Sequence, residues 1–230
     1  MPRSTLTRDQ IVRTAVDLLD DEGLDGLNMR ALGRRLGVAP TAVYWHVKDK
    51  DALMLLAGDE VWDEIDLPDP DREGWRPAAT RLATGLHAMC GRHPWLVQAL
   101  GSYVLHGPRK ARYDDRCLAV FEAAGFADDD ADRAAAAVFT YVLGNAVGAS
   151  ATASLTRRLA RGGADPRRAL EDATAEAAAV ARTFPRLRRR VDSPAAARYN
   201  AGPDQAFAYG LDALLDGIEA GLSGAPAAAS

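Results

Sequence analysis

The apolar positions of this chain recur with the spacing of helices rather than of strands. Near the N-terminus, Thr7 and Gln10 have the spacing of a helix-capping box, and apolar residues follow at intervals of three and four until Gly23. No stretch alternates apolar and polar residues convincingly over the length of a strand. The pattern therefore predicts an all-α chain.

Two short helices come next, over residues 29–36 and 40–47. Asn28 can cap the first of them, Gly37 permits a tight turn, and Pro40 suits the first position of the second. Two short helices joined by a turn of three or four residues that contains glycine form a helix-turn-helix. The first part of the chain is thus predicted to be a helix-turn-helix unit.

A loop separates this unit from the rest of the chain. Asp49 can cap a helix that runs to about residue 66, and the following stretch, 67–75, has two prolines, a glycine and several acidic residues. Beyond it, helices are expected over roughly 76–91, 94–101, 109–124, 130–153, 166–183 and 203–222. We expect a helix-turn-helix domain at 1–50, a connecting helix at about 49–66, a regulatory and dimerisation domain at 67–224, and a flexible tail at 225–230.

The second helix of the motif carries aromatic residues where a solvated surface would be polar. Val43 and Val47 lie one turn apart and form its inward side, so Trp45 should point outward. Tyr44 and His46 flank the indole. A surface of this composition is suited to contact with a partner molecule, although packing of both aromatic rings on a neighbouring helix remains an alternative.

The charge of the chain is unevenly distributed. The net charge of −4 argues against a protein that coats nucleic acid without specificity. From residue 27 to residue 50, however, Asp49 is the only acidic residue, and the basic residues are Arg30, Arg34, Arg35, Lys48 and Lys50. A basic head on an acidic remainder favours a protein that contacts DNA at one end.

A DNA-reading helix-turn-helix places the N-terminus of its second helix against base edges in the major groove. Pro40 and Thr41 occupy that end, and Arg30 in the preceding helix is the best candidate for a guanine contact. The residues expected to contact phosphates or sugars are Tyr44, Trp45, His46 and Lys50.

The stretch "GLDGLNMRALGRRLGVAPTAVYWHVKDKDALM" resembles the DNA-binding head of the TetR family of bacterial regulators, and "YWHVK" is similar to the form in tetracycline repressors. The resemblance implies a homodimeric repressor that leaves a palindromic operator when a small molecule enters the C-terminal domain. Pro40 and Ala42 depart from the glutamine and threonine of tetracycline repressors, so their operator sequence is not transferred. The positions that match the family's DNA contacts are Asn28, Arg30, Pro40, Thr41, Tyr44, Trp45, His46 and Lys50.

The resemblance extends to the C-terminal half. Residues 204–222 look like the last helix of the tetracycline-repressor type, which pairs with the helix near 130–153 across the dimer. The small residues of that helix allow close approach, and the last helix has a broad apolar stripe. Burial of both helices within one subunit is the alternative. The expected interface residues are Gly144, Gly148, Phe207, Leu211, Leu214, Leu215 and Ile218.

The resemblance does not predict the same ligand. In tetracycline repressors a histidine and a glutamate help to hold magnesium-tetracycline, and the matching positions here are Thr140 and Gly148. We therefore expect an unknown inducer other than magnesium-tetracycline, less charged and aromatic. The candidate lining residues are Trp95, Tyr103, His106, Phe139 and Asn145, each of which could instead be an ordinary packing residue.

Other chemistry finds little support in the sequence. His87, Cys90 and His93 have a ligand-like spacing that drifts off one helix face, so no metal site and no cofactor is expected. Catalytic and nucleotide-binding motifs are absent, and we expect no enzyme activity. The rival functions are a helix-bundle enzyme that carries a helix-turn-helix, and a regulator controlled by a protein partner. An arginine run, residues 186–190, is interpreted as a solvated helix end or loop.

The expected location is the cytoplasm. Two isolated cysteines indicate no disulfide framework, and the first residues have no apolar signal segment. Residues 134–156 carry no charge, but they are mostly small, so burial by protein is favoured over a membrane span.

Overall fold

The computed structural model describes residues 6–163, 165–193 and 203–224, and these form helices without any strand, as the sequence predicts. The predicted tail at 225–230 lies outside the described residues. The elements are α1 (Arg8–Gly26), α2 (Met29–Leu36), α3 (Pro40–Tyr44), α4 (Lys50–Glu60), the 3-10 helix η1 (Val61–Glu64), α5 (Pro70–Glu73), α6 (Trp75–Arg92), α7 (Pro94–Leu100), α8 (Pro108–Ala123), α9 (Asp128–Arg161), α10 (Pro166–Ala181), α11 (Pro185–Val191) and α13 (Pro203–Gly224).

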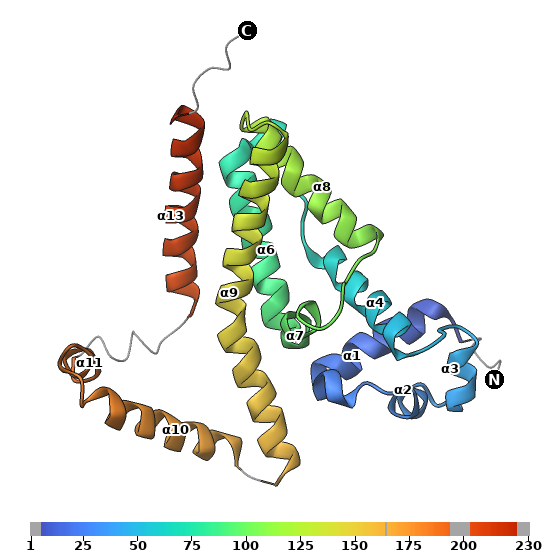
Figure 1. Cartoon of the computed structure of the whole chain (residues 1–230). Helices are drawn as coiled ribbons and strands as arrows, with labels where there is room; N and C mark the ends of the chain where they lie inside the picture. Colours follow the sequence, from blue (N-terminus) through green and yellow to red (C-terminus); the bar gives the residue numbers. More distant parts are fainter. Residues whose placement is uncertain (1–5, 164, 194–202, 225–230) are drawn as a thin grey trace.

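A small head and a larger body are joined by α4. Helices α1, α2 and α3 form the head, and α4 leads from it to the body (Figure 1). In the body the long helix α9 packs against α6, α7, α8 and α13. Helices α10 and α11 extend away from these helices on the far side from the head (Figure 1).

The local signals in the head act as the sequence indicates. Thr7 and Gln10 form the reciprocal capping box of α1. The side chain of Asn28 accepts a hydrogen bond from the backbone N–H of Ala31 at 2.9 Å, which caps α2. Gly37 ends α2 in the left-handed region at φ 67°, which glycine adopts without strain. The turn between α2 and α3 is therefore fixed by local chemistry.

Several predicted boundaries were wrong. Helix α3 ends at Tyr44 instead of Val47, because the chain turns there to reach the cap of α4 at Asp49. Helix α9 continues to Arg161, since arginine, leucine and alanine sustain a helix. The predicted loop contains the short helix α5, and the arginine run lies on the exposed helix α11.

Helix α9 is long and apolar enough to cross a membrane by length and composition, but one such helix is weak evidence. One side of it is buried in the body through Ala134, Val138, Val142 and Ala146. Only 28% of its most apolar window is buried within the single chain. Most of this apolar window is therefore exposed in the single chain.

A buried histidine joins the head, η1 and the body. His93, between α6 and α7, lies 2.7 Å from Asp20 of α1 through Nδ1 and 2.8 Å from Glu64 of η1 through Nε2. The indole N–H of Trp95 donates to the same Asp20 carboxylate at 2.7 Å. Trp95 is fully buried in this contact, and its role in lining a ligand pocket stays a prediction.

The surroundings of His93 favour its charged form. Burial lowers the pKa of His93, but the hydrogen bonds to Asp20 and Glu64 outweigh burial, so the net pKa is raised. Burial likewise raises the pKa of Glu64, and its hydrogen bonds with His93 and Arg92 outweigh that effect and lower the pKa. An imidazolium between two carboxylates therefore stabilises the joint between head and body.

This charge arrangement predicts a pH-dependent stability. Because the folded-state pKa of His93 is raised, its contribution is fully present below about pH 6.5, the usual histidine pKa, and is lost as the pH rises through the folded-state pKa. Urea unfolding between about pH 5.5 and 8.5 should show a wild-type advantage over His93→Gln that shrinks with rising pH. The exposed His106 gives the control His106→Gln, and a His93→Gln deficit that is constant across this range would contradict the assignment.

Candidate DNA interface and ligand pocket

The aromatic residues at the end of α3 point outward. Val43 and Val47 are buried in the head, whereas the side chains of Tyr44 and Trp45 are 52% and 88% exposed. His46 is exposed beside them. The alternative that these rings pack against a neighbouring helix is therefore wrong for this chain alone.

The polar residues predicted to contact DNA differ in whether their side chains already form hydrogen bonds within the chain. Arg30 and Thr41 are exposed. Asn28 uses its side chain as the cap of α2 and also donates from Nδ2 to the carbonyl of Gly26 at 3.0 Å. The Lys50 ammonium donates to the backbone carbonyl of Leu24 at 3.2 Å, which leaves two of its three N–H groups for another partner.

Two features of the helix-turn-helix escaped the sequence analysis. Pro40 is half-buried at the start of α3, and a Cβ atom at Gly33 would lie 2.9 Å from the carbonyl oxygen of Val38. The absence of a side chain at Gly33 thus lets α2 and the turn approach closely. The small residue in the middle of α2 was the available signal.

A groove of about 260 Å³ lies between α8 and α9. Of the five residues predicted to line a ligand pocket, Phe139 is at this groove. His106 is exposed, and its Nδ1 faces the carbonyl oxygen of Val104 at 2.9 Å. Asn145 donates to the carbonyl of Tyr141 in its own helix at 2.8 Å, and Tyr103 is half-buried against the core. The residues that line the groove are Lys110, Tyr113, Asp114, Cys117, Leu118, Asp132, Ala135, Ala136 and Phe139.

Lys110 occupies the aromatic end of this groove. Its ammonium lies 5.3 Å from the ring centroid of Trp62 and 5.7 Å from that of Phe139, within the range of cation–π attraction. It also forms an ion pair with Asp114 at 2.6 Å. The ring of Tyr113 lies 4.9 Å from that of Trp62. Sequence analysis missed Lys110 because no local pattern brings Trp62 next to α8.

Several hydrogen-bond donors lie in this groove or next to it. The buried indole Nε1 of Trp62 has no hydrogen-bond partner among the described residues. Burial raises the pKa of Tyr113 and raises that of Cys117 to about 12, so both keep their protons at neutral pH. A buried N–H without a partner is uncommon in proteins, and this one lies next to the lining residues Lys110 and Tyr113.

A buried carboxylate connects this groove with the connecting helix. Asp59 of α4 accepts hydrogen bonds from the backbone N–H groups of Arg109 and Lys110 at 3.1 and 2.9 Å, at the start of α8. Since Lys110 also lines the groove, the first turn of α8 touches both the groove and α4. This arrangement connects the groove to the helix that carries the head.

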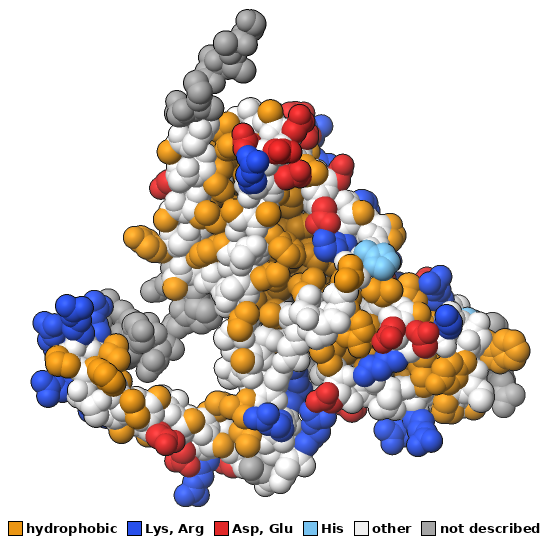
Figure 2. All heavy atoms as spheres, in the orientation of Figure 1, with side chains coloured by type: hydrophobic (Ala, Val, Ile, Leu, Met, Phe, Trp, Pro, Cys, Tyr) orange, Lys and Arg blue, Asp and Glu red, His pale blue; other side chains and the backbone are white. Residues whose placement is uncertain are grey.

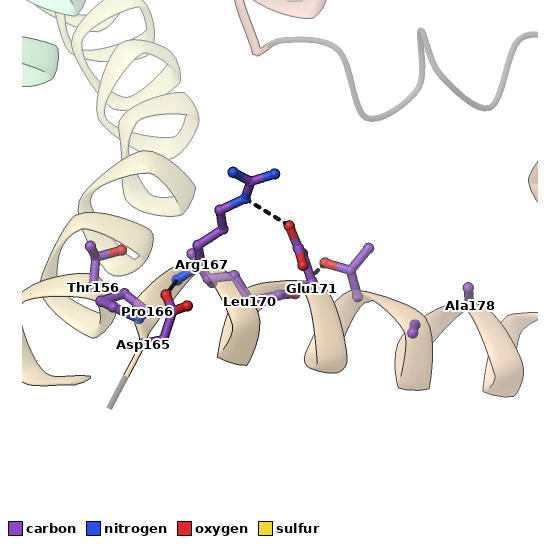
Figure 3. Close-up of a pocket in the computed structure, with 9 residues that line it drawn as sticks. Thr156, Asp165, Pro166, Arg167, Leu170, Glu171 and Ala178 are labelled. Atoms are coloured by element: carbon purple, nitrogen blue, oxygen red, sulfur yellow. Dashed lines mark hydrogen bonds and ion pairs between the residues drawn. The ribbon is translucent and has the colours of Figure 1, made fainter. Parts of the chain in front are cut away.

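Two other hollows lie outside this groove. The hollow between the end of α9 and α10, of about 800 Å³, is shown in Figure 3, where Asp165 caps α10 and Arg167 pairs with Glu171 at 2.9 Å. Helix α10 buries no residue there. The hollow between α6 and α13, of about 600 Å³, contains His87, whose ring stacks on Phe207 at 4.0 Å. His87 is thus engaged away from Cys90 and His93.

The predicted dimer residues fall into two groups. A Cβ atom at Gly144 or Gly148 would meet nothing within 4 Å, so both face away from the body. Phe207, Leu211 and Leu215 are instead buried within the single chain, and their assignment to the interface was wrong. They form the inward side of α13. Leu214 and Ile218 are half-buried.

The outward faces of α9 and α13 carry apolar residues that the sequence analysis missed. Val147 of α9 and Tyr209 of α13 are 54% and 80% exposed. Val147 lies between Gly144 and Gly148 in the sequence, which was the available signal. Such exposed apolar residues on adjacent helices are suited to a protein contact.

Comparison with known proteins places these features in a family. A family model described as "Tetracyclin repressor-like, C-terminal domain" matches residues 67–222, and one described as "Bacterial regulatory proteins, tetR family" matches residues 11–57. The transcriptional repressor DrrR1 of Streptomyces coeruleorubidus is 32% identical over 95% of this chain and 79% of its own length. The class C tetracycline repressor of Escherichia coli is 30% identical over 93% of this chain and 91% of its own length.

Further similarities agree with these matches. An HTH-type transcriptional regulator of Saccharopolyspora erythraea is 38% identical over 140 residues. This aligned region covers 61% of this chain and 59% of the relative's length. The structure of the TetR-family protein ActR of Streptomyces coelicolor in complex with actinorhodin has a TM-score of 0.72 and 26% identity, with 100% of each chain covered. The chain therefore belongs to the TetR family of bacterial transcriptional regulators, with a helix-turn-helix DNA-binding head and a C-terminal domain of the tetracycline-repressor type.

Proposed function

We propose that this protein is a cytoplasmic, homodimeric repressor that binds a palindromic operator and leaves it when an aromatic small molecule enters the groove between α8 and α9. The observation that carries the proposal is the exposed aromatic and basic surface of the helix-turn-helix, which has no role in packing the single chain. The family, and the repressors among the relatives, support this direction of regulation.

The head divides its work between reading and positioning. Arg30 and Thr41, exposed near the start of α2 and α3, read base edges, together with the methylene groups of Pro40. Tyr44, Trp45, His46, Asn28 and Lys50 contact the sugar–phosphate backbone. For Asn28 and Lys50 this role uses the N–H groups that remain after their bonds to Gly26 and Leu24.

The ligand is an aromatic molecule with acceptor oxygens. Phe139 and Tyr113 offer aromatic faces, while the ammonium of Lys110 offers hydrogen-bond donors. ActR, a relative of similar fold, is described in complex with actinorhodin, which supports a small-molecule ligand for this domain. A displaced Lys110 would move the first turn of α8, and the hydrogen bonds to Asp59 would transmit that shift to α4.

The dimer forms through the outward faces of α9 and α13. Gly144 and Gly148 allow close approach of the symmetry-related helix, and Val147 and Tyr209 supply apolar area. A two-fold interface of this kind presents two heads to successive major grooves.

The decisive experiment selects bound sites from random DNA with the purified protein and then screens small molecules for release. A palindromic site with half-site centres about one helical turn apart, or a little more, is expected. Release by a protein partner but by no small molecule would favour the alternative regulator, and substrate turnover without selected sites would favour the enzyme.

The head predicts a difference between reading and positioning residues. Arg30→Ala and Thr41→Ala should each cost about 1–3 kcal/mol on the selected operator and much less on a scrambled duplex. Lys50→Ala should weaken binding to both duplexes alike and reduce the slope of the salt dependence by about 0.9 for each phosphate that Lys50 neutralises. Titrations at several salt concentrations check this, and loss of specificity in Lys50→Ala alone would reverse the assignment.

The interface predicts the effect of a charge on α9. Gly148→Glu would place two carboxylates in the apolar contact at the two-fold axis, so the protein should elute as a monomer and lose affinity for the full palindrome. Thr152→Glu, one turn further along the exposed side of α9, tests how far the contact reaches. A dimeric Gly148→Glu variant with unchanged operator affinity would place the interface elsewhere.

The groove predicts a matched pair of variants on α9. Phe139→Ala should require a roughly tenfold or higher inducer concentration for release, because loss of a buried aromatic contact costs about 1.5–3 kcal/mol, while operator affinity stays nearly constant. Asn145→Ala, whose amide bonds its own helix, should release normally. Equal sensitivity of the two variants, measured by inducer titration of the operator complex, would argue against this groove.

A further inference from the structure

The connection between α9 and α10 is a strongly basic stretch outside the head. Residues 157–168 contain five arginines and one aspartate in a chain of net charge −4. Figure 3 shows that Arg167 is already engaged by Glu171 and that Asp165 is used as the cap of α10. The arginines at the end of α9 are Arg157, Arg158 and Arg161.

Arg157 attaches the end of α9 to the head. Its guanidinium donates to the backbone carbonyl of Asp20 at 3.2 Å. A Cβ atom at Gly23 would lie 3.3 Å from Nε of Arg157, so the side chain fits against the bend of α1. Arg157 is half-buried and is a structural residue of the joint.

Arg158 and Arg161 lie beside the same joint but remain free. Together with Glu22 and Asp25 of α1 they line a polar cleft of about 280 Å³. Both arginines are exposed, and neither forms an ion pair with any residue in the described ranges. They are therefore not fixed to these two carboxylates and can act on another anion.

The cleft adjoins the residues proposed to hold DNA phosphates. Leu24 is part of its lining, and the carbonyl of Leu24 binds the ammonium of Lys50. The carbonyl of Gly26, two residues further, binds Asn28. Arg158 and Arg161 are thus neighbours of the segment that positions Lys50 and Asn28.

The shape of the molecule extends this basic surface past the head. The lower end of α9 lies beside α1, on the side of the head away from α3 (Figure 1). Lys and Arg side chains gather along the lower edge of the molecule, below α2, over the lower end of α9 and below α10 (Figure 2). Helix α9 also carries the outward-facing Gly144 and Gly148, so the helix proposed to form the dimer contact is the one that ends in these arginines.

We propose that Arg158 and Arg161 form a second contact with the operator, to backbone phosphates in the stretch between the two half-sites. This inference rests on the proposed function. An exposed guanidinium suits phosphate oxygens because it presents planar, permanently charged donors. The contact is to the backbone, so it adds affinity without sequence preference.

The test compares the full-length protein with Arg158→Ala/Arg161→Ala on the selected operator and on a scrambled duplex, by anisotropy at several salt concentrations. The variant should bind both duplexes several-fold more weakly, and its salt slope should fall by about 0.9 for each phosphate that is no longer neutralised. Arg158→Lys/Arg161→Lys should keep most of the slope, because the charge remains. Operators with neutral methylphosphonates between the half-sites should weaken the wild type and leave the double alanine variant almost unchanged.

The matched control is Arg72→Ala/Arg133→Ala, which removes the same formal charge from exposed positions on α5 and at the opposite end of α9. Equal slopes and affinities for the two double alanine variants would overturn the proposal, as would a loss confined to the selected operator, which indicates base reading. A wild type without any sequence preference would instead refute the proposed function, and the scrambled duplex would still report the arginine contacts.

Discussion

Asp59 carries a carboxylate that is buried where α4 crosses the start of α8, and a buried charge is tolerated only where hydrogen bonds compensate it. The compensation comes from the free backbone N–H groups of the first turn of α8, where the helix dipole also favours an anion. Hydrogen bonds to a charged group contribute about 1.5–3 kcal/mol each, and removal of one partner leaves an unpaired group. The position of α4, and with it the position of the head, is therefore tied to the first turn of α8.

A second charged contact holds the other side of the head. The carboxylate of Asp20 in α1 lies within hydrogen-bond distance of the imidazole of His93 and accepts a hydrogen bond from the indole N–H of Trp95. The guanidinium of Arg157 donates to the backbone carbonyl of the same residue. These polar, directional contacts add to the apolar core that the head and the body share. Polar contacts of this kind break and re-form in discrete steps. They are therefore suited to a contact between head and body that has two alternative arrangements. Under the proposed function, a ligand that moves Lys110 shifts the balance between them.

The sequence predicted the parts of the structure that depend on local chemistry. The capping residues Thr7, Asn28 and Asp49, the turn at Gly37 and the outward direction of Trp45 follow from short-range spacing, and the structure has each of them. The family resemblance indicated the arrangement of the body. Helix boundaries were less predictable, since α3 ends early and α9 continues beyond its apolar stretch.

The candidate pocket could not be predicted in the same way. Phe139 lies at a groove, and its contact with a ligand stays a prediction. Trp95 was assigned to a pocket because large aromatic residues suit ligands, and nothing near it in the sequence indicates its bond to Asp20, 75 residues away. Lys110 and Trp62 are likewise far apart in the sequence. Phe207, Leu211 and Leu215 formed the apolar stripe that the sequence showed, yet periodicity cannot tell whether a stripe faces its own subunit or a partner.

The unassigned apolar surface gives the last constraint. A 34-residue helix that buries only 28% of its most apolar window would be a liability in water unless a second surface covered it. Gly144 and Gly148 on its outward side allow close approach of an identical helix, with the exposed Val147 beside them. If a symmetric pair forms there, the same helix that fixes the two-fold axis also ends in Arg158 and Arg161 beside the head. The distance between the two heads, and so the spacing of the half-sites, would then be determined by one rigid element.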